Sequence, residues 1–210
     1  MTTPAPRALR TLVPFEIALV LLLAIAPLPQ ALPIALPLFV AASLSLWVRG
    51  RSWGEVVHAN RLHAVGGALV GVAAIGLAVL VGGPIVEASS QRAIEWSMFP
   101  IVRGNASAFG GVVIMAGIGA LCMELALRGW IVERVLELSP GPAVLPILVG
   151  AFAEALLTPG DLAAKIGGGL FGLGLGWIYV AAGRNVVAPV LARMMFSVGA
   201  VVLEALRVIG

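Results

Sequence analysis

The 210-residue chain is far more apolar than a soluble domain of its length. Hydrophobic residues make up 60% of it and charged residues 11%, and its mean hydropathy is +1.08. A soluble domain carries about 25% charged residues, so most of this surface must face lipid. The net charge of +3 does not indicate nucleic-acid binding, because no segment combines a basic face with stacking aromatics. We therefore expect an integral membrane protein that contacts membrane lipid and no nucleic acid.

Long apolar runs recur along the whole chain. A helix that crosses the hydrocarbon core needs about 20 mostly apolar residues. The predicted spans are 13–29, 31–48, 64–83, 107–132, 142–158, 164–182 and 186–206. No run alternates apolar and polar residues as a membrane β-barrel strand does. The sequence thus predicts an all-α polytopic bundle of about seven transmembrane helices, forming one domain over 1–210 with three N-terminal helices in 1–83.

The first apolar run resembles a signal peptide but lacks a cleavage site. Arg7 and Arg10 precede it, no small-residue cleavage motif follows, and the second span begins just after Pro27-Leu28-Pro29-Gln30. We interpret it as a retained first helix in a tight helical hairpin.

The basic residues predict the orientation of the bundle, because short cytoplasmic loops are enriched in them. A cytoplasmic N-terminus puts Arg7, Arg10, Arg49, Arg51, Arg61, Arg134 and Arg184 on that side, and Arg92, Arg103, Lys165 and Arg207 on the other. The seven-to-four bias favours that orientation. An alanine-rich chain with more arginine than lysine is typical of a GC-rich bacterium, so we expect the inner membrane.

Two polar connections interrupt the spans. In the first, residues 49–63, we expect a short interfacial helix anchored by Trp47 and Trp53, since tryptophan favours the headgroup level. Its His58 and His63 are five residues apart, about 140° around a helix, so we interpret them as surface residues and not as a metal pair. In residues 84–105 we expect a short amphipathic helix lying on the membrane.

Small residues mark close helix contacts. Gly168, Gly172 and Gly176 are spaced four apart, and Gly67 and Gly71 repeat the spacing in the third span. Such patterns let backbones approach closely in lipid. We favour packing within one chain over a dimer interface, and we expect the single cysteine, Cys122, to have a packing role as well.

Ionisable residues at membrane depth are the unusual feature of the second half. Each costs roughly 2.5–3.5 kcal/mol on insertion scales, so each needs a partner or a function. They are Glu124 and Arg128 in the fourth span, Glu154 in the fifth, and Arg193 and Glu204 in the seventh, while Glu16 starts the first. Glu124 and Arg128 are four apart on one helix face, the spacing of a structural ion pair.

Three blocks in this half resemble one protease family. Residues 123–130, Met-Glu-Leu-Ala-Leu-Arg-Gly-Trp, resemble the Glu-Glu-x-x-x-Arg-Gly signature of the CPBP family of CAAX-processing and bacteriocin-processing intramembrane proteases, also called Abi proteins. Residues 171–179 resemble the family's glycine-rich helix. Residues 183–193 resemble its turn and small-Pro-x-x-x-His helix start, except at the last position. The resemblance covers roughly 105–200.

The resemblance implies helices around a cavity that is open to the membrane. In the family, the first glutamate of the signature, two histidines and an asparagine form a catalytic cluster that is thought to activate water, with a metal. A carboxylate serves as general base, and imidazoles hold a divalent ion that lowers the pKa of its bound water toward ~7.

This sequence departs from the family at each catalytic position. The first glutamate is Met123, which leaves Glu124 as the second acid. The first histidine corresponds to Leu156 or Thr158, depending on the register. The second histidine is Arg193 and the asparagine is Ser197. The degenerate site therefore comprises Met123, Glu124, Arg128, Leu156, Thr158, Arg193 and Ser197, with no metal or other cofactor expected.

We expect that the fold persists without the protease activity. Our hypothesis is that Arg193 projects into the former site and pairs with Glu124 or Glu154, because a guanidinium stays protonated and cannot ligate a metal. No histidine follows His63 and Asp161 is the one aspartate, so neither a serine–histidine nor an aspartyl dyad can form at membrane depth.

Three function classes remain. The first is an inactive CPBP-like scaffold or accessory subunit that binds another membrane protein or a hydrophobic ligand. The second is an atypical CPBP endopeptidase that uses Glu124 or Glu154 without histidine. The third is a transport component, which the absence of an inverted repeat disfavours.

Overall fold

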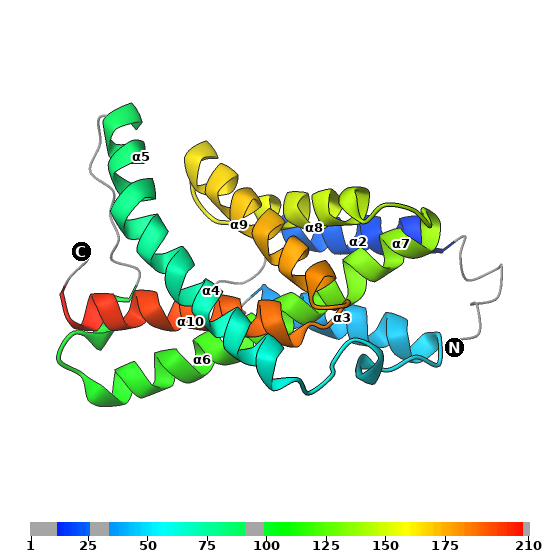
Figure 1. The fold of residues 1–210 in the computed structure, drawn as a ribbon, viewed down its shortest axis with the longest axis horizontal. Coiled ribbons are helices and arrows are strands. Elements are labelled where there is room, and N and C mark those ends of the chain that lie inside the picture. The colour runs from blue at the N-terminus through cyan, green and yellow to red at the C-terminus, as the bar shows by residue number, and fades with distance from the viewer. Residues whose placement is uncertain (1–11, 26–33, 91–98, 208–210) are drawn as a thin grey trace.

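The computed structural model describes residues 12–25, 34–90 and 99–207, and in these ranges it is helical and contains no strand (Figure 1). Seven helical runs make up this part of the chain. They are α2 (Val13–Ile25), α3 (Ala35–Val48), α4 (Arg61–Leu77) with η2 (Ala78–Gly82) and α5 (Gly83–Ser90), α6 (Ala106–Glu124) with η4 (Leu125–Val132) and α7 (Glu133–Leu138), α8 (Val144–Leu157), α9 (Leu162–Ala181) and α10 (Val187–Ala205). Two short 3₁₀ turns, η1 (Trp53–Glu55) and η3 (Pro100–Val102), lie in the connections.

The runs confirm the all-α prediction, and one helical run overlaps each of the seven predicted spans. Four are long and apolar enough to cross a membrane: Arg61–Ala88, Ala106–Leu138, Leu162–Ala181 and Val187–Ala205. The other three, α2, α3 and α8, are shorter apolar helices. The predicted hairpin turn at residues 27–30 lies outside the described residues, as do Arg7, Arg10 and Arg92.

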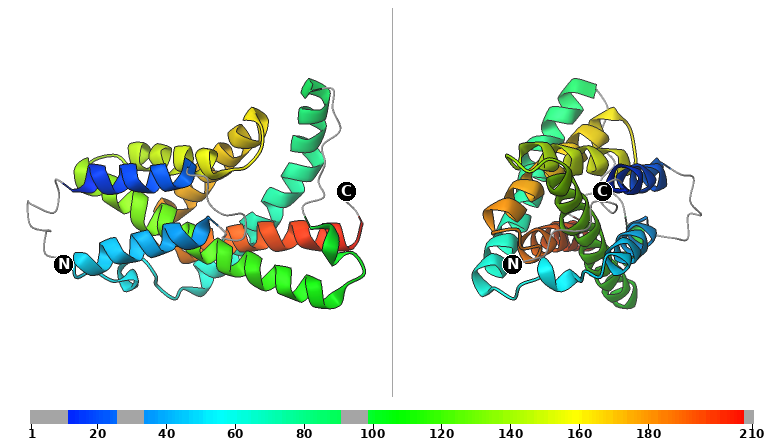
Figure 2. Two further views of the ribbon diagram at one scale, coloured as in Figure 1. Left: turned by 180° about the vertical axis from the view of Figure 1, so that it is seen from behind. Right: turned by 90° about the vertical axis from the view of Figure 1, so that its right-hand side faces the viewer.

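The helices form a bundle elongated along α6 and α10, which lie side by side. α2 and α8 run together in a second layer, and α9 packs on α8 and crosses obliquely toward α10 (Figures 1 and 2). α4 packs along α10 at its start and then diverges, so that α5 projects from the bundle in both figures.

Glycines create the two closest helix contacts. A Cβ added to Gly67 or Gly71 would lie 2.2 Å from a carbonyl oxygen of α10, that of Ala188 or Ala192 respectively. Gly168, Gly172 and Gly176 of α9 face α8 in the same manner, against Thr158, Glu154 and Ile147. Both stripes therefore pack within the chain, as predicted.

Side chains cap three helices at their N-termini. Asn60 Oδ1 accepts hydrogen bonds from the backbone N–H groups of Leu62 and His63, at 2.9 and 3.3 Å. Asn105 caps α6 and Asp161 caps α9, the latter through Ala164 N at 3.0 Å. Such caps satisfy N–H groups that have no partner inside the helix. They explain why asparagine or aspartate stands at these three starts.

The connections differ from expectation in the residues that the structure describes. Residues 83–90 continue α4 through a π-turn that accommodates Pro84, which lacks an N–H, while residues 91–98 of the expected amphipathic helix lie outside the described residues. In the first connection the helix is a single 3₁₀ turn. Trp47 is 76% exposed, as an anchor should be, whereas Trp53 stacks on Phe39 with ring centroids 5.6 Å apart.

Asn185 ties the first connection to the α9–α10 turn. Its side-chain Nδ2 donates to the carbonyl of His58 at 2.8 Å and lies 3.1 Å from His63 Nδ1. Its Oδ1 accepts from the N–H groups of His58 and Val187. His58 is exposed as expected, but His63 is half-buried in this contact, which the sequence did not indicate.

We predict that Asn185→Asp loosens this connection. The substitution removes the hydrogen bond donated to His58 and places a carboxylate against that carbonyl, so local opening should rise by roughly tenfold. Trypsin cleavage at Arg61 in detergent should accelerate accordingly. Asn60→Asp is the matched control, because Asn60 only accepts and aspartate caps equally well. Equal cleavage of the two variants would contradict the role of Asn185.

Candidate functional site

Four charged side chains from four elements meet inside the bundle. Glu124 ends α6, Arg128 lies in η4, Glu154 lies in α8 and Arg193 in α10. Glu124 and Arg128 are fully buried and Glu154 is 4% exposed. The side chain of Arg193 is 14% exposed and closes the cluster on its outer side. We call these four residues the charge cluster.

Each arginine of the charge cluster contacts both glutamates. Arg193 Nε lies 2.5 Å from Glu124 Oε1, and its Nη2 lies 2.5 Å from Glu154 Oε2. Arg128 Nη1 lies 3.3 Å from the same oxygen of Glu124 and 2.9 Å from the same oxygen of Glu154. Arg193 thus pairs with both acids, where the sequence hypothesis named one or the other.

Local backbone features bring these side chains together. Arg128 belongs to a π-helical segment of eight residues, a rare element that is frequent at functional sites. Its Nη2 donates to the carbonyl of Gly172 at 2.8 Å, and the missing Cβ of Gly172 lets α9 approach Glu154. The guanidinium of Arg193 also lies 5.3 Å from the centre of the Phe171 ring, a cation–π contact.

The charge cluster is electrically balanced but incompletely hydrogen-bonded. Two acids face two bases, so no net charge is buried. Within the described part of the chain, Glu124 Oε2 and Arg128 Nε have no hydrogen-bond partner. Buried ion pairs of this kind contribute little net stability, whereas removal of one partner costs about 3–5 kcal/mol.

The remaining predicted site residues lie around the cluster without joining its ion pairs. Met123 is half-buried and packs against the apolar core. Leu156 is half-buried on α8, and Thr158 Oγ1 donates to the backbone carbonyl of Glu154 at 2.8 Å. Ser197 lies one turn beyond Arg193 and is half-buried. From α8, it is therefore Glu154 that reaches Arg193, and neither residue suggested by the register of the family motif does.

The described part of the chain is an all-helical bundle of the membrane-protein class, with four helices long and apolar enough to cross a membrane. Residues 105–199 match the family model described as type II CAAX prenyl endopeptidase Rce1-like, which confirms the resemblance to the CPBP family over this part of the chain. All four residues of the charge cluster fall within the match. No curated protein and no solved structure matches the chain.

The donors of the charge cluster do not fit the metal that the family implies. The oxygens that point into the cluster already accept from guanidinium groups, and two fixed positive charges oppose a divalent cation. Zinc sites draw on imidazole, thiolate or carboxylate. Among the residues described, no group of three histidine, cysteine, aspartate or glutamate side chains converges.

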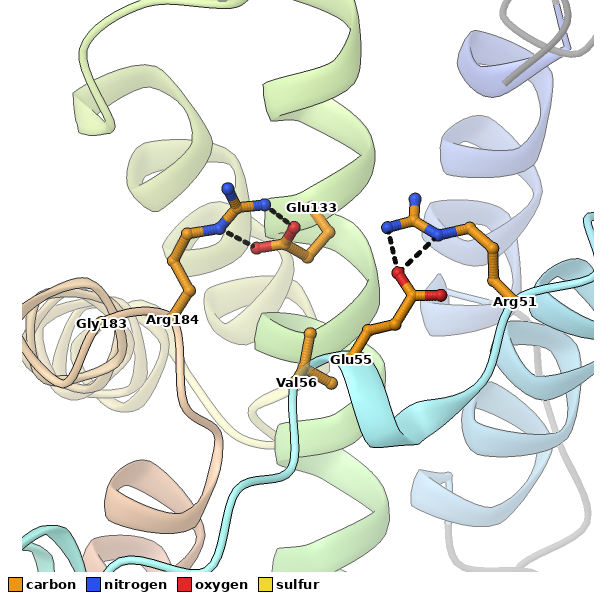
Figure 3. A pocket seen from close by; sticks show the side chains of 6 residues that line it. All are labelled: Arg51, Glu55, Val56, Glu133, Gly183 and Arg184. Carbon is orange, nitrogen blue, oxygen red and sulfur yellow. Dashed lines mark hydrogen bonds and ion pairs between the residues drawn. The ribbon is translucent and has the colours of Figure 1, made fainter. Parts of the chain in front are cut away.

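A second polar region was missed by sequence reasoning. Arg51, Glu55, Val56, Glu133, Gly183 and Arg184 line an open pocket of about 300 Å³ where the first connection meets the α9–α10 turn (Figure 3). Arg184 pairs with Glu133, which also accepts from Tyr179 Oη at 2.7 Å. Hydrogen bonds from Arg51 lower the pKa of Glu55. The sequence holds one weak sign of this region, namely that its arginines were all placed on the predicted cytoplasmic side.

Proposed function

We propose that this CAAX-protease-like membrane protein is an accessory subunit that has lost peptidase activity and binds another membrane component. The observation that supports the proposal is the position of Arg193. By the sequence resemblance it corresponds to the family's second histidine, and it contacts both acids of the site at 2.5 Å.

The contacts of Arg193 explain why we expect no peptidase activity. A general base needs a free lone pair within reach of a water molecule. Here Glu124 Oε1 and Glu154 Oε2 each accept from two guanidinium groups, and Arg193 offers no lone pair to a metal. The helices that would surround a substrate remain, which is why we assign the chain a binding role for a hydrophobic ligand or a transmembrane segment.

A cleavage assay tests the loss of activity. We expect purified wild type, Glu124→Gln and Glu154→Gln to leave a prenylated CAAX-type peptide and a set of transmembrane peptides equally intact. Cleavage by wild type that either variant abolishes would overturn the proposal and establish the atypical peptidase. That alternative draws its support from Glu124 Oε2, which has no hydrogen-bond partner in the described residues.

The binding role is tested by native mass spectrometry after purification in mild detergent. We expect one protein or lipid-like species at constant stoichiometry with the chain. A chain that carries nothing, together with ion or solute flux in liposomes, would contradict the accessory role and favour a transport component.

A further inference from the structure

The pocket lined by Arg51, Glu55, Glu133 and Arg184 lies apart from the charge cluster and takes no part in the proposed function. Glu133 is nine residues beyond Glu124 on one continuous helical run, roughly 13 Å along its axis. Figure 3 shows two ion pairs on opposite walls, Arg184 with Glu133 and Arg51 with Glu55.

The pocket lining is neutral, and one arginine and one glutamate in it can each take a further contact. Arg184 donates to Glu133 from Nε and Nη2, so its Nη1 has no partner among the described residues. Both side-chain hydrogen bonds from Arg51 go to Oε2 of Glu55, and the backbone of Ser52 also bonds this carboxylate, which keeps lone pairs for a further donor. A ligand that contacts both Arg184 and Glu55 must carry a hydrogen-bond acceptor for the arginine and a cation for the glutamate.

The accessible ion pairs leave room for such a ligand. The side chain of Arg184 is 54% exposed and that of Glu55 is 27% exposed. Arg184 and Glu55 are therefore the members of the two pairs that a ligand can reach from solvent. A Cβ on Gly183 would meet nothing within 4 Å, which shows open space above the turn.

The backbone of the turn holds Arg184 in place. Gly183 and Arg184 both have left-handed conformations, with φ of 68° and 65°. A residue with a Cβ rarely adopts this conformation, and here the guanidinium lines the pocket (Figure 3).

The surroundings place the pocket at the level of lipid headgroups. It lies where α3 and α9 end and α10 begins, and the exposed Trp47 is in the last turn of α3. Tryptophan in that position marks the membrane interface. Guanidinium groups bind phosphate, and carboxylates bind ammonium.

We propose that this pocket binds the headgroup of a zwitterionic phospholipid, with the phosphate at Arg184 and the ammonium at Glu55. A neutral pocket with an accessible arginine and an accessible glutamate selects a headgroup that carries both charges over one that is only anionic.

The test measures lipid retained by delipidated protein in native mass spectrometry. The probes are phosphatidylethanolamine and phosphatidylglycerol with identical acyl chains, and soluble phosphoethanolamine. Wild type should prefer phosphatidylethanolamine, and Arg184→Asn should reduce its retention about tenfold, the loss expected for one charge-assisted contact. Arg207→Asn is the matched control, because Arg207 also follows a helix end with a positive φ, of 58°, and is exposed.

Arg184→Asn could reduce lipid retention by disturbing the fold, so Glu55→Gln serves as a second variant. Arg184→Asn leaves buried Glu133 with Tyr179 alone, whereas Glu55→Gln leaves Arg51 paired with Glu137. Glu55→Gln should abolish the preference for phosphatidylethanolamine over phosphatidylglycerol. Equal retention by all variants, no preference in wild type, or equally tight binding of phosphoethanolamine would each overturn the proposal.

Discussion

Replacement of Arg193 by leucine should destabilise the protein by about 3–5 kcal/mol. The substitution leaves Glu124 and Glu154 sharing the single cation of Arg128 inside the bundle, where an uncompensated carboxylate is costly. Unfolding can be followed in detergent with a thiol-reactive dye, because the one cysteine, Cys122, is 7% exposed. A large drop in the unfolding temperature is expected.

Two further variants separate the lost charge from lost packing. Arg193→Leu combined with Glu124→Gln should recover much of the stability, because the acids and bases are again equal in number. Arg61→Leu, an exposed arginine at the start of α4, should change the unfolding temperature little. If Arg193→Leu unfolds at the same temperature as wild type, the ion pairs of Arg193 with Glu124 and Glu154 do not stabilise the protein.

Gly71→Ala should be the second severe substitution. The added methyl group would lie 2.2 Å from the carbonyl oxygen of Ala192 and 2.9 Å from Met195 Cβ, so α4 must move away from α10. Overpacking of this kind costs about 1–3 kcal/mol, and a backbone obstacle places it at the upper end. The dye assay with Cys122 reports the change.

The same helix supplies the control. A Cβ on Gly76 meets nothing within 4 Å, so Gly76→Ala should be neutral or slightly stabilising through its better helix propensity. Gly67 and Gly66 form a second matched pair, obstructed and open respectively. Equal effects of alanine at Gly71 and Gly76 would show that α4 does not pack on α10 through its glycines.

The sequence predicted the helices and the glycine contacts because lipid imposes simple rules. A span needs an apolar run, and close packing needs small residues at a spacing of four. It also predicted that Arg193 would meet a buried acid, because isolated charges are costly at that depth. These features depend on composition and local spacing, which a single chain displays directly.

The contacts that were not predicted depend on distant segments. The sequence predicted that Arg193 pairs with Glu124 or Glu154, but not that it pairs with both, which happens because α6 and α8 each present one acid to it. The pocket joins Arg51 and Arg184 from connections more than a hundred residues apart, through ion pairs and a left-handed turn. Neither the hydrophobic periodicity of the sequence nor a sequence motif predicts that these two residues lie close together.

We propose that Arg193 takes the place of a metal in the part of the chain that resembles CAAX proteases. Elemental analysis of the purified protein, prepared without chelators, tests it most directly. We predict a transition-metal content far below one ion per chain, unchanged in the Glu124→Gln and Glu154→Gln double variant. One tightly bound divalent metal per chain in wild type, lost in that variant, would contradict the account.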